Sequence, residues 1–514
     1  MTRERERAPS TPSTRGEPLE PEHLTDLGNA RRLVRLFGDD VRYVPPLKKW
    51  LLWDTTRWQP DETGGIYRFA KLVVAGIYSE AGYELQDARR DALGKHAVRS
   101  ESVRALQAMV TLAQTEAGVP VVPEQLDVDP WLLNCANGTL ELRRGTLRPP
   151  RREDLITKII PVAYEAEAPC PTWLAFLDGI LGGRESLVYF VQRAIGGALT
   201  GLTTEQVLFI LWGAGANGKS TFIVALTRIL AAYAATMDAS TLLARKGEGM
   251  AAQNDLATLA GIRFAAAMES DMGRRMAEAL VKQVTGGDHL KVRRLYADPF
   301  EIIPAFKIVL STNHRPIIRG TDATIWRRLR LIPFTVTIPD SEQDHLLLDK
   351  LAAEAPGILA WAVQGCLAWQ REGLGNPEEV RAATAAYRQE MDLLGDFLAD
   401  RCVLEPDAAV AASDLYASYA DWTPKTGEKP MSQKALGAHL TERGFDKTRS
   451  RPERQWRGVR LRGSMEPVTD VTDRDASPGN FMTTTAREES YRNQRRHPSR
   501  VTDDTPGWVT GATE

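Results

Sequence analysis

Apolar and polar positions alternate most regularly between residues 205 and 338. Short apolar runs there take turns with stretches of helical periodicity, a pattern typical of a wound α/β core with a mostly parallel sheet. The apolar run 207–212 predicts a strand, and the helical pattern 221–233 follows it after a glycine-rich loop. We therefore expect an α/β core over residues 205–338.

The chain before this core predicts two further parts. Residues 25–170 mix strand and helix patterns and predict an α+β leader domain, whereas residues 171–204 predict a helical bridge broken at Gly182-Gly183. Within the leader we expect a short hairpin over 50–58, helices over 66–83 and 102–117, and a strand over 135–142.

After the core, the pattern is first helical and then mixed. Residues 339–405 predict a helical extension, and residues 406–463 predict a winged helix with helices at 413–422 and 432–443 and a strand-turn-strand at 445–462. Ser432 is expected to cap the second helix. Eight lysines or arginines against two acids in 443–462 favour DNA contact, although similar small domains also bind proteins.

Both ends of the chain are rich in charged or small polar residues. Residues 1–24 and 464–514 are therefore predicted to be disordered tails.

The glycine-rich loop carries the clearest chemical signal. Its glycines allow backbone N–H groups to surround phosphate oxygens, Lys219 can reach the β and γ phosphates, and Ser220 can ligate Mg²⁺. As an exposed loop residue, Lys219 is expected to neutralise phosphate charge rather than to pack in a core. The alternative is an ordinary βα turn. The predicted nucleotide-binding residues are Gly213, Ala214, Gly215, Ala216, Asn217, Gly218, Lys219, Ser220 and Thr221.

Composition limits the classes of partner, metal site and cellular compartment that the sequence supports. A formal net charge of −2 over 514 residues gives no global attraction to nucleic acid, so such binding has to come from local patches. The four cysteines form no CxxC pair, which argues against a zinc site or a disulfide framework and suits a reducing cytoplasm. No run approaches 18 apolar residues, so no membrane span or secretion signal is predicted.

Polar side chains follow two more predicted strands of the core. The strand 264–268 ends at Glu269, with Asp271 close behind, and a carboxylate at that position can hold Mg²⁺ and polarise an attacking water. The alternative is an acid near the start of the next helix. The strand 306–310 leads to Asn313, whose amide can orient the lytic water or instead form an Asx turn.

A basic stretch follows at 326–330. A guanidinium of this stretch can stabilise transition-state charge, in trans if subunits form a ring, or the stretch can be a solvated basic face.

The order of these elements resembles the superfamily 3 helicase module of phage and plasmid primase-helicases, a group that includes poxvirus relatives. The resemblance extends upstream to 133–140 and to Trp53-Asp54, which are similar to the leader domain of that family, and covers about residues 25–460. It implies an AAA+-like P-loop ATPase that forms a hexameric ring and translocates 3′ to 5′ on single-stranded DNA. The matching core segments are 213–221, Glu269, 282–288, 294–296, 311–313 and 319–328.

The family motifs assign roles to individual residues. Lys219 and Ser220 match the phosphate and Mg²⁺ positions. Glu269 matches the acidic second motif and hence a Mg²⁺ and catalytic position, although the run 265–267 is all alanine where relatives have a more β-branched strand. Asn313 matches the sensor.

The same resemblance assigns the arginine finger and the DNA contacts. Arg328 matches the finger, with Arg327 left open. The segment 288–300 matches a hairpin that projects into the ring channel, where cations neutralise phosphates and an aromatic stacks on bases; the alternative is an exposed hairpin made soluble by charge. Its predicted DNA-binding residues are Lys291, Arg293, Arg294 and Tyr296.

Primase-helicases of this family usually carry a polymerising domain before the leader, and only about 24 residues precede the leader here. The expectation is a helicase without its own primase domain, working in phage, plasmid or other mobile-element replication, with a separately encoded primase as a possible partner. Two alternatives remain. One is an ATP-dependent DNA-binding initiator or regulatory switch, and the other is a winged-helix protein on a degenerate ATPase scaffold, against which the intact motifs argue.

Overall fold

The computed structural model describes most of the chain between residues 22 and 463. Glu269, Asp271, Arg294 and Tyr296 lie outside the described residues, as do residues 464–514 and almost all of the predicted N-terminal tail. The described ranges are 22–244, 250–268, 274–293, 298–318, 323–426, 430–448 and 454–463.

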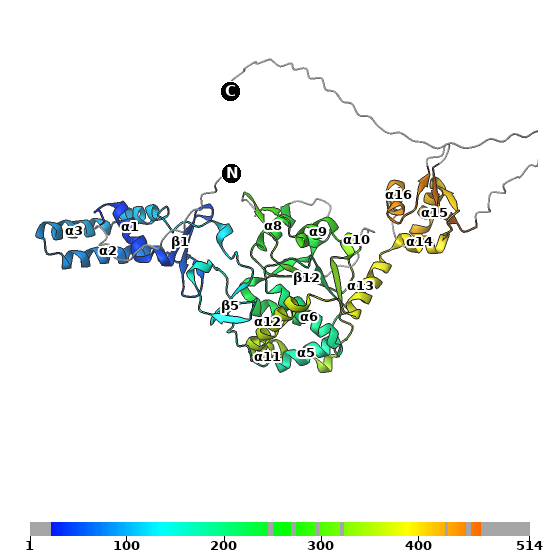
Figure 1. Ribbon diagram of the computed structural model, residues 1–514, viewed down its shortest axis with the longest axis horizontal. Helices are drawn as coiled ribbons and strands as arrows, with labels where there is room; N and C mark the ends of the chain where they lie inside the picture. Colours follow the sequence, from blue (N-terminus) through cyan, green and yellow to red (C-terminus); the bar gives the residue numbers. More distant parts are fainter. Residues whose placement is uncertain are drawn as a thin grey trace, which may run out of the picture. The chain divides into compact units, whose positions relative to one another are not determined.

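A five-stranded, fully parallel sheet forms the centre of the α/β region, as the sequence pattern predicts (Figure 1). Its strand order is β13-β7-β12-β9-β8, so β7 and β12 are neighbours although almost a hundred residues separate them. The strands are β7 (Leu208–Trp212), β8 (Ala234–Asp238), β9 (Phe264–Met268), β12 (Lys307–Thr312) and β13 (Leu329–Pro333).

Side chains of this sheet alternate between two buried cores. Phe209 and Leu211 of β7 pack into one core with α5, α6, α7 and α12, whereas Leu208 and Ile210 pack into the other with α8 and α9. Both faces of the sheet are therefore covered, which explains why its strands are continuous apolar runs. The elements around the sheet are α7 (Lys219–Leu230), α8 (Met250–Thr258), α9 (Glu278–Gly286), β10 (Leu290–Arg293), β11 (Pro299–Ile302) and α10 (Ala323–Trp326).

The bridge consists of α5 (Pro171–Leu181) and α6 (Glu185–Ala198), which are separated at Gly182-Gly183 as predicted. Both glycines have positive φ values, 68° and 69°, which few other residues adopt. Downstream, α11 (Leu347–Ala353) leads into α12 (Ala355–Glu372), and α12 packs tightly on α6.

Glycines permit that close packing. A Cβ atom on Gly196 of α6 would lie 2.0 Å from the Cys366 backbone nitrogen, and one on Gly365 would lie 2.2 Å from the Gln192 carbonyl oxygen. The two helices approach until their backbones touch, a distance that any side chain at these glycines would increase.

The N-terminal region contains helices and two small antiparallel sheets, β1-β2-β3 and β4-β5-β6. The predicted hairpin is confirmed by β2 and β3. The single strand predicted over 135–142 is wrong, because Ala136-Asn137 turns the chain between two paired strands. The elements are α1 (Asp26–Phe37), β1 (Val41–Val44), β2 (Lys49–Trp53), β3 (Trp58–Pro60), α2 (Gly65–Tyr83), α3 (Asp87–Ser100), α4 (Val103–Ala113), β4 (Leu132–Cys135), β5 (Gly138–Glu141) and β6 (Thr146–Arg148).

One buried arginine joins this N-terminal region to the sheet. Arg263, directly before β9, is 5% exposed and donates to the carbonyl oxygens of Leu199 at 2.6 Å, Leu132 at 2.8 Å and Asp129 at 3.3 Å. Its guanidinium also lies over the Tyr233 ring, 4.8 Å from the centroid. A buried charge is tolerated here because backbone oxygens replace its water.

The C-terminal region has its own core, in which Phe397 packs edge-on against Tyr419 and Trp422. Ser432 caps α16 by accepting from the Ala435 N–H, which confirms the predicted cap. The elements are α13 (Glu378–Glu390), α14 (Leu393–Arg401), β14 (Cys402–Val403), β15 (Ala409–Ala411), α15 (Ala412–Trp422), α16 (Gln433–Glu442), β16 (Lys447–Thr448), β17 (Gln455–Arg457) and β18 (Arg460–Leu461).

Across the described residues, no single helix is long and apolar enough to cross a membrane. The bent pair Asp340–Ala353 and Ala355–Glu372 reaches the required length and composition, with a bend of 75°. Most of its second helix, α12, is buried in the protein core.

Candidate active site

The glycine-rich loop lies between β7 and α7, at the carboxyl edge of the sheet. A Cβ atom on Gly213 would lie 2.0 Å from the Phe334 carbonyl oxygen, and Gly218 combines a φ of 78° with an approach to Ile180 of α5. These two positions therefore require glycine for space and for conformation. Because α7 begins at Lys219, directly after the loop, its free N–H groups and the positive end of its dipole lie beside the loop.

Lys219 is buried, with 4% of its surface exposed, so the expectation of an exposed loop lysine is wrong. The loop curls around the ammonium, which donates to the carbonyl oxygens of Gly213 at 2.7 Å and Ala214 at 3.2 Å. It also donates at 3.0 Å to the Oδ1 atoms of Asn217 and Asn313. All four partners are uncharged, and burial lowers the pKa of Lys219 to about 8. Among the residues that the structure describes, the ammonium is bonded to neutral oxygens only, an environment that suits an anionic ligand.

Asn313 reaches this lysine because of the strand order. It follows β12, which pairs in parallel with β7, so the ends of the two strands meet at one edge of the sheet. The turn after Asn313 is held by Thr312, whose Oγ1 accepts from the His314 N–H at 3.0 Å. The Asn313 side chain therefore contacts Lys219, while its role as a sensor stays a prediction.

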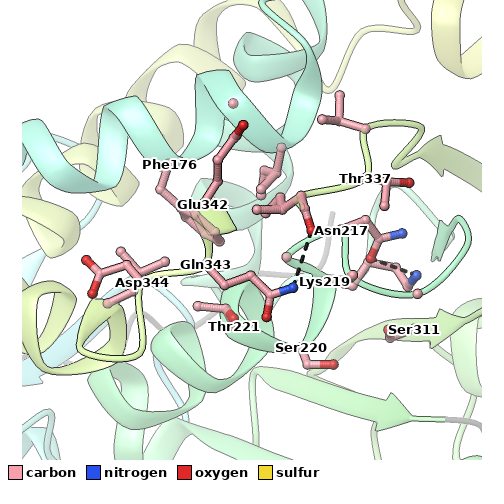
Figure 2. Close-up of a pocket in the computed structure, with 18 of the residues that line it drawn as sticks. Phe176, Asn217, Lys219, Ser220, Thr221, Ser311, Thr337, Glu342, Gln343 and Asp344 are labelled. Atoms are coloured by element: carbon pink, nitrogen blue, oxygen red, sulfur yellow. Dashed lines mark hydrogen bonds between the residues drawn. The ribbon is translucent and has the colours of Figure 1, made fainter. Parts of the chain in front are cut away.

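A pocket of about 690 Å³ opens over the loop (Figure 2). Ser220 is exposed and lines it together with Lys219 and Thr221, and Met268 brings the end of β9 to its wall. Glu269, the predicted catalytic carboxylate, follows Met268 in the sequence and lies outside the described residues.

The other walls contain residues that the sequence motifs do not identify. Phe176 and Ile180 come from α5, and Thr337, Gln343 and Asp344 come from the segment that follows β13 (Figure 2). Phe176 precedes the loop by about forty residues and Gln343 follows it by more than a hundred. Nothing in their local sequence marks them, because an apolar helix position and a polar loop are both common.

The two candidate finger arginines have opposite environments. Arg328 is 8% exposed and its Nη1 donates to Thr285 Oγ1 of α9 at 2.9 Å, whereas Arg327 is exposed. The backbone of Arg328 is also fixed, since its carbonyl accepts from the Leu208 N–H at 2.7 Å. Of the two candidates, only Arg327 presents its side chain at the surface, where a finger supplied in trans has to lie, and the choice between them stays a prediction.

The predicted DNA-binding hairpin is present as β10 and β11, which pair antiparallel. Lys291 and Arg293 are exposed on one face of β10, whereas Leu290 and Val292 between them are buried. Lys291 is paired in register with Glu301 of β11, so the described part of the hairpin is not purely basic.

Two protein families match separate parts of the chain. Residues 30–182 match the family described as "D5 N terminal like", and residues 211–328 match a "Family of unknown function (DUF5906)". The second match includes the glycine-rich loop, Asn313 and both candidate arginines.

Individual relatives are viral. A protein of Acanthamoeba polyphaga mimivirus named "Putative helicase" is 27% identical over 333 residues, which are 60% of this chain and 35% of the mimivirus protein. An African swine fever virus protein named "Putative primase" is 24% identical over 330 residues, 58% of this chain and 34% of its own length. The chain thus spans about a third of the length of these relatives. The solved A form apo structure of the NrS-1 C-terminal region aligns with a TM-score of 0.47 at 11% identity, covering 85% of this chain and 100% of that one.

Proposed function

Because the chain belongs to the phage and viral primase-helicase family, we propose that it is an ATP-dependent DNA helicase of superfamily 3 that translocates 3′ to 5′ on single-stranded DNA. The observation that carries this proposal is the 3.0 Å contact between the Lys219 ammonium and the Asn313 amide beneath the pocket. A phosphate-binding lysine and a sensor amide are two groups that ATP hydrolysis needs at the same γ-phosphate.

The residues around the pocket suit Mg²⁺-bound ATP. The N–H groups at the start of α7 and the Lys219 ammonium would bind phosphate oxygens, and the exposed Ser220 hydroxyl would be a Mg²⁺ ligand. Bound Mg²⁺ neutralises charge on the phosphates. Glu269 is the proposed base that orients and polarises the attacking water. Asn313, whose side chain is hydrogen-bonded to Lys219, is the proposed sensor of the γ-phosphate.

Assembly and DNA binding complete the proposal. A homo-hexameric ring places the exposed Arg327 of one subunit at the nucleotide of the next, where a guanidinium stabilises transition-state charge. Lys291 and Arg293, with Arg294 and Tyr296, bind single-stranded DNA through phosphates and stacking.

Forked-duplex unwinding tests this function, with ATP supplied and Lys219→Ala as the control. ATP-dependent strand separation by the wild-type chain and none by Lys219→Ala is the expected result. DNA-stimulated ATP hydrolysis without any strand separation would instead establish the DNA-binding switch. No ATP hydrolysis by the wild-type chain, with or without DNA, would overturn both.

A further inference from the structure

Arg315 lies two residues beyond Asn313 and stacks on the strand that leads into the phosphate loop. Its guanidinium carbon is 3.8 Å from the centroid of the Trp212 ring, and Trp212 directly precedes Gly213. Neither Arg315 nor Trp212 lines the pocket. A planar guanidinium on an indole is a specific, partly desolvated contact, so Arg315 holds the sensor turn against the base of the phosphate loop without touching the nucleotide.

The other side of Arg315 is occupied by α13. Glu390, the last residue of that helix, forms an ion pair with the Arg315 guanidinium, whose side chain is only 16% exposed. Tyr387, one turn earlier, is fully buried and donates its hydroxyl to the Pro316 carbonyl oxygen. The end of α13 therefore holds residues 315–316, which begin two residues beyond Asn313.

The same tyrosine contacts the segment that carries the proposed finger. The Tyr387 ring packs edge-on against Trp326, with centroids 5.2 Å apart and planes at 83°, and Trp326 directly precedes Arg327. On the preceding turn of α13, Thr384 Oγ1 accepts from the Leu331 N–H of β13 at 3.1 Å. One face of α13 thus packs on both chain segments that bring polar groups to the nucleotide.

The chain continues from α13 into the C-terminal region after two residues. Asp392 caps α14 by accepting from the Gly395 N–H at 3.0 Å, and it forms an ion pair with Arg443 at the end of α16. A shift of α16 relative to α14 can therefore act on Asp392, two residues from Glu390.

We propose that Arg315 is a positioning residue that couples the nucleotide pocket to α13 and, through the Asp392–Arg443 ion pair, to the C-terminal region. This proposal rests on the proposed ATPase function and extends it. Movement of the C-terminal region shifts Arg315, and with it Asn313, and so changes the rate of ATP turnover. Arg315 acts through Asn313 and Trp212, so it affects hydrolysis and not nucleotide binding.

Substitution of Arg315 separates these two effects. Arg315→Ala should lower kcat for ATP about two- to thirtyfold, the range measured for residues that link coupled sites, with KM unchanged. Arg315→Lys keeps the ion pair with Glu390 but loses the planar stack, so it should recover part of the rate. Glu390→Gln lies at a half-exposed position, preserves the fold, and should reproduce part of the Arg315→Ala loss.

The matched control is Glu378→Gln, which removes an exposed ion pair with Arg381 on the same helix and should leave kcat unchanged. Thermal melting checks that each variant is folded. Unchanged kcat in folded Arg315→Ala, in a preparation whose wild type hydrolyses ATP, would overturn the proposal while the ATPase assignment survives. A rise in KM equal to the fall in the rate would also overturn it, because it would place Arg315 in binding.

A double-mutant cycle tests the connection to the C-terminal region. Arg443→Gln should change kcat in the wild-type background, and the change should be absent when Arg315 is already alanine, because the route to the pocket is then broken. Equal effects of Arg443→Gln in both backgrounds would refute the connection through Arg315.

Discussion

Two adjacent arginines, one exposed and one buried, allow a matched test of the proposed active site shared between subunits. Arg327→Ala removes an exposed guanidinium, and Arg328→Ala removes a buried one that is bonded to Thr285. If Arg327 is the finger, the first change should strongly reduce turnover without affecting the fold, and the second should destabilise the fold with a smaller effect on turnover.

The structure sets the magnitudes. Arg328→Ala loses one hydrogen bond from a charged donor, worth about 1.5–3 kcal/mol, while Thr285 Oγ1 keeps its own bond to the Val281 carbonyl at 2.6 Å. We therefore expect Arg328→Ala to lower the free energy of unfolding by about 1–3 kcal/mol. Arg327→Ala should change it by less than about 0.5 kcal/mol, as exposed substitutions do, but should lower kcat by about 10³ to 10⁵.

Urea unfolding and steady-state ATP hydrolysis measure the two quantities. Mixing Arg327→Ala with Lys219→Ala subunits should then restore activity above the sum of the two preparations, because some interfaces pair an intact loop with an intact finger. Confirmed mixed rings without recovered activity would show that Arg327 is not supplied in trans. Full turnover by Arg327→Ala would refute the assignment altogether.

Three further outcomes follow from single features. Burial lowers the pKa of Lys219 to about 8, so the charged ammonium is present below that pH and lost above it. ATP affinity, measured by titration calorimetry, should therefore be flat below about pH 7 and fall by up to tenfold per pH unit above about pH 8. Lys219→Ala should lack this pH dependence. Gly365→Ala places a methyl 2.2 Å from a carbonyl oxygen of α6 and should cost about 1–3 kcal/mol or more in thermal unfolding, whereas Gly76→Ala, in the open on α2, should be neutral or stabilise by up to about 1 kcal/mol. Replacing Lys291 and Arg293 by alanine should reduce the slope of log affinity for single-stranded DNA against log salt by about 0.7 per lost phosphate contact; an unchanged slope would make the hairpin structural.

The sequence pattern predicted those elements of the fold that depend mainly on residues close together in the chain. The strand, glycine loop and helix around Lys219 follow from hydrophobic periodicity, and even the alanine run 265–267 forms a strand, because its small side chains are buried on both faces of the sheet. The turn at Ala136-Asn137 was missed, although the Asn137-Gly138 dipeptide is a hairpin signal within an apolar stretch.

Contacts between segments that are distant in the chain could not be predicted from the hydrophobic pattern. The burial of Lys219 depends on how the loop closes around it, and the exposure of Arg327 rather than Arg328 depends on where α9 packs. Periodicity shows α13 only as one more amphipathic helix. Its contacts with Arg315 join residues about 75 positions apart, for which a single sequence carries no signal.

The contacts of the buried Arg263 indicate that the smallest stable folding unit does not coincide with the region that carries the ATPase sequence motifs. A chain that starts at residue 171 contains every motif of the proposed ATPase, yet it lacks the Asp129 and Leu132 carbonyls that accept from this guanidinium. The guanidinium would keep one of its three carbonyl acceptors, and each lost hydrogen bond from a charged donor is worth about 1.5–3 kcal/mol. The smallest independently stable form of the proposed ATPase should therefore begin before residue 129, because part of the leader stabilises the α/β core.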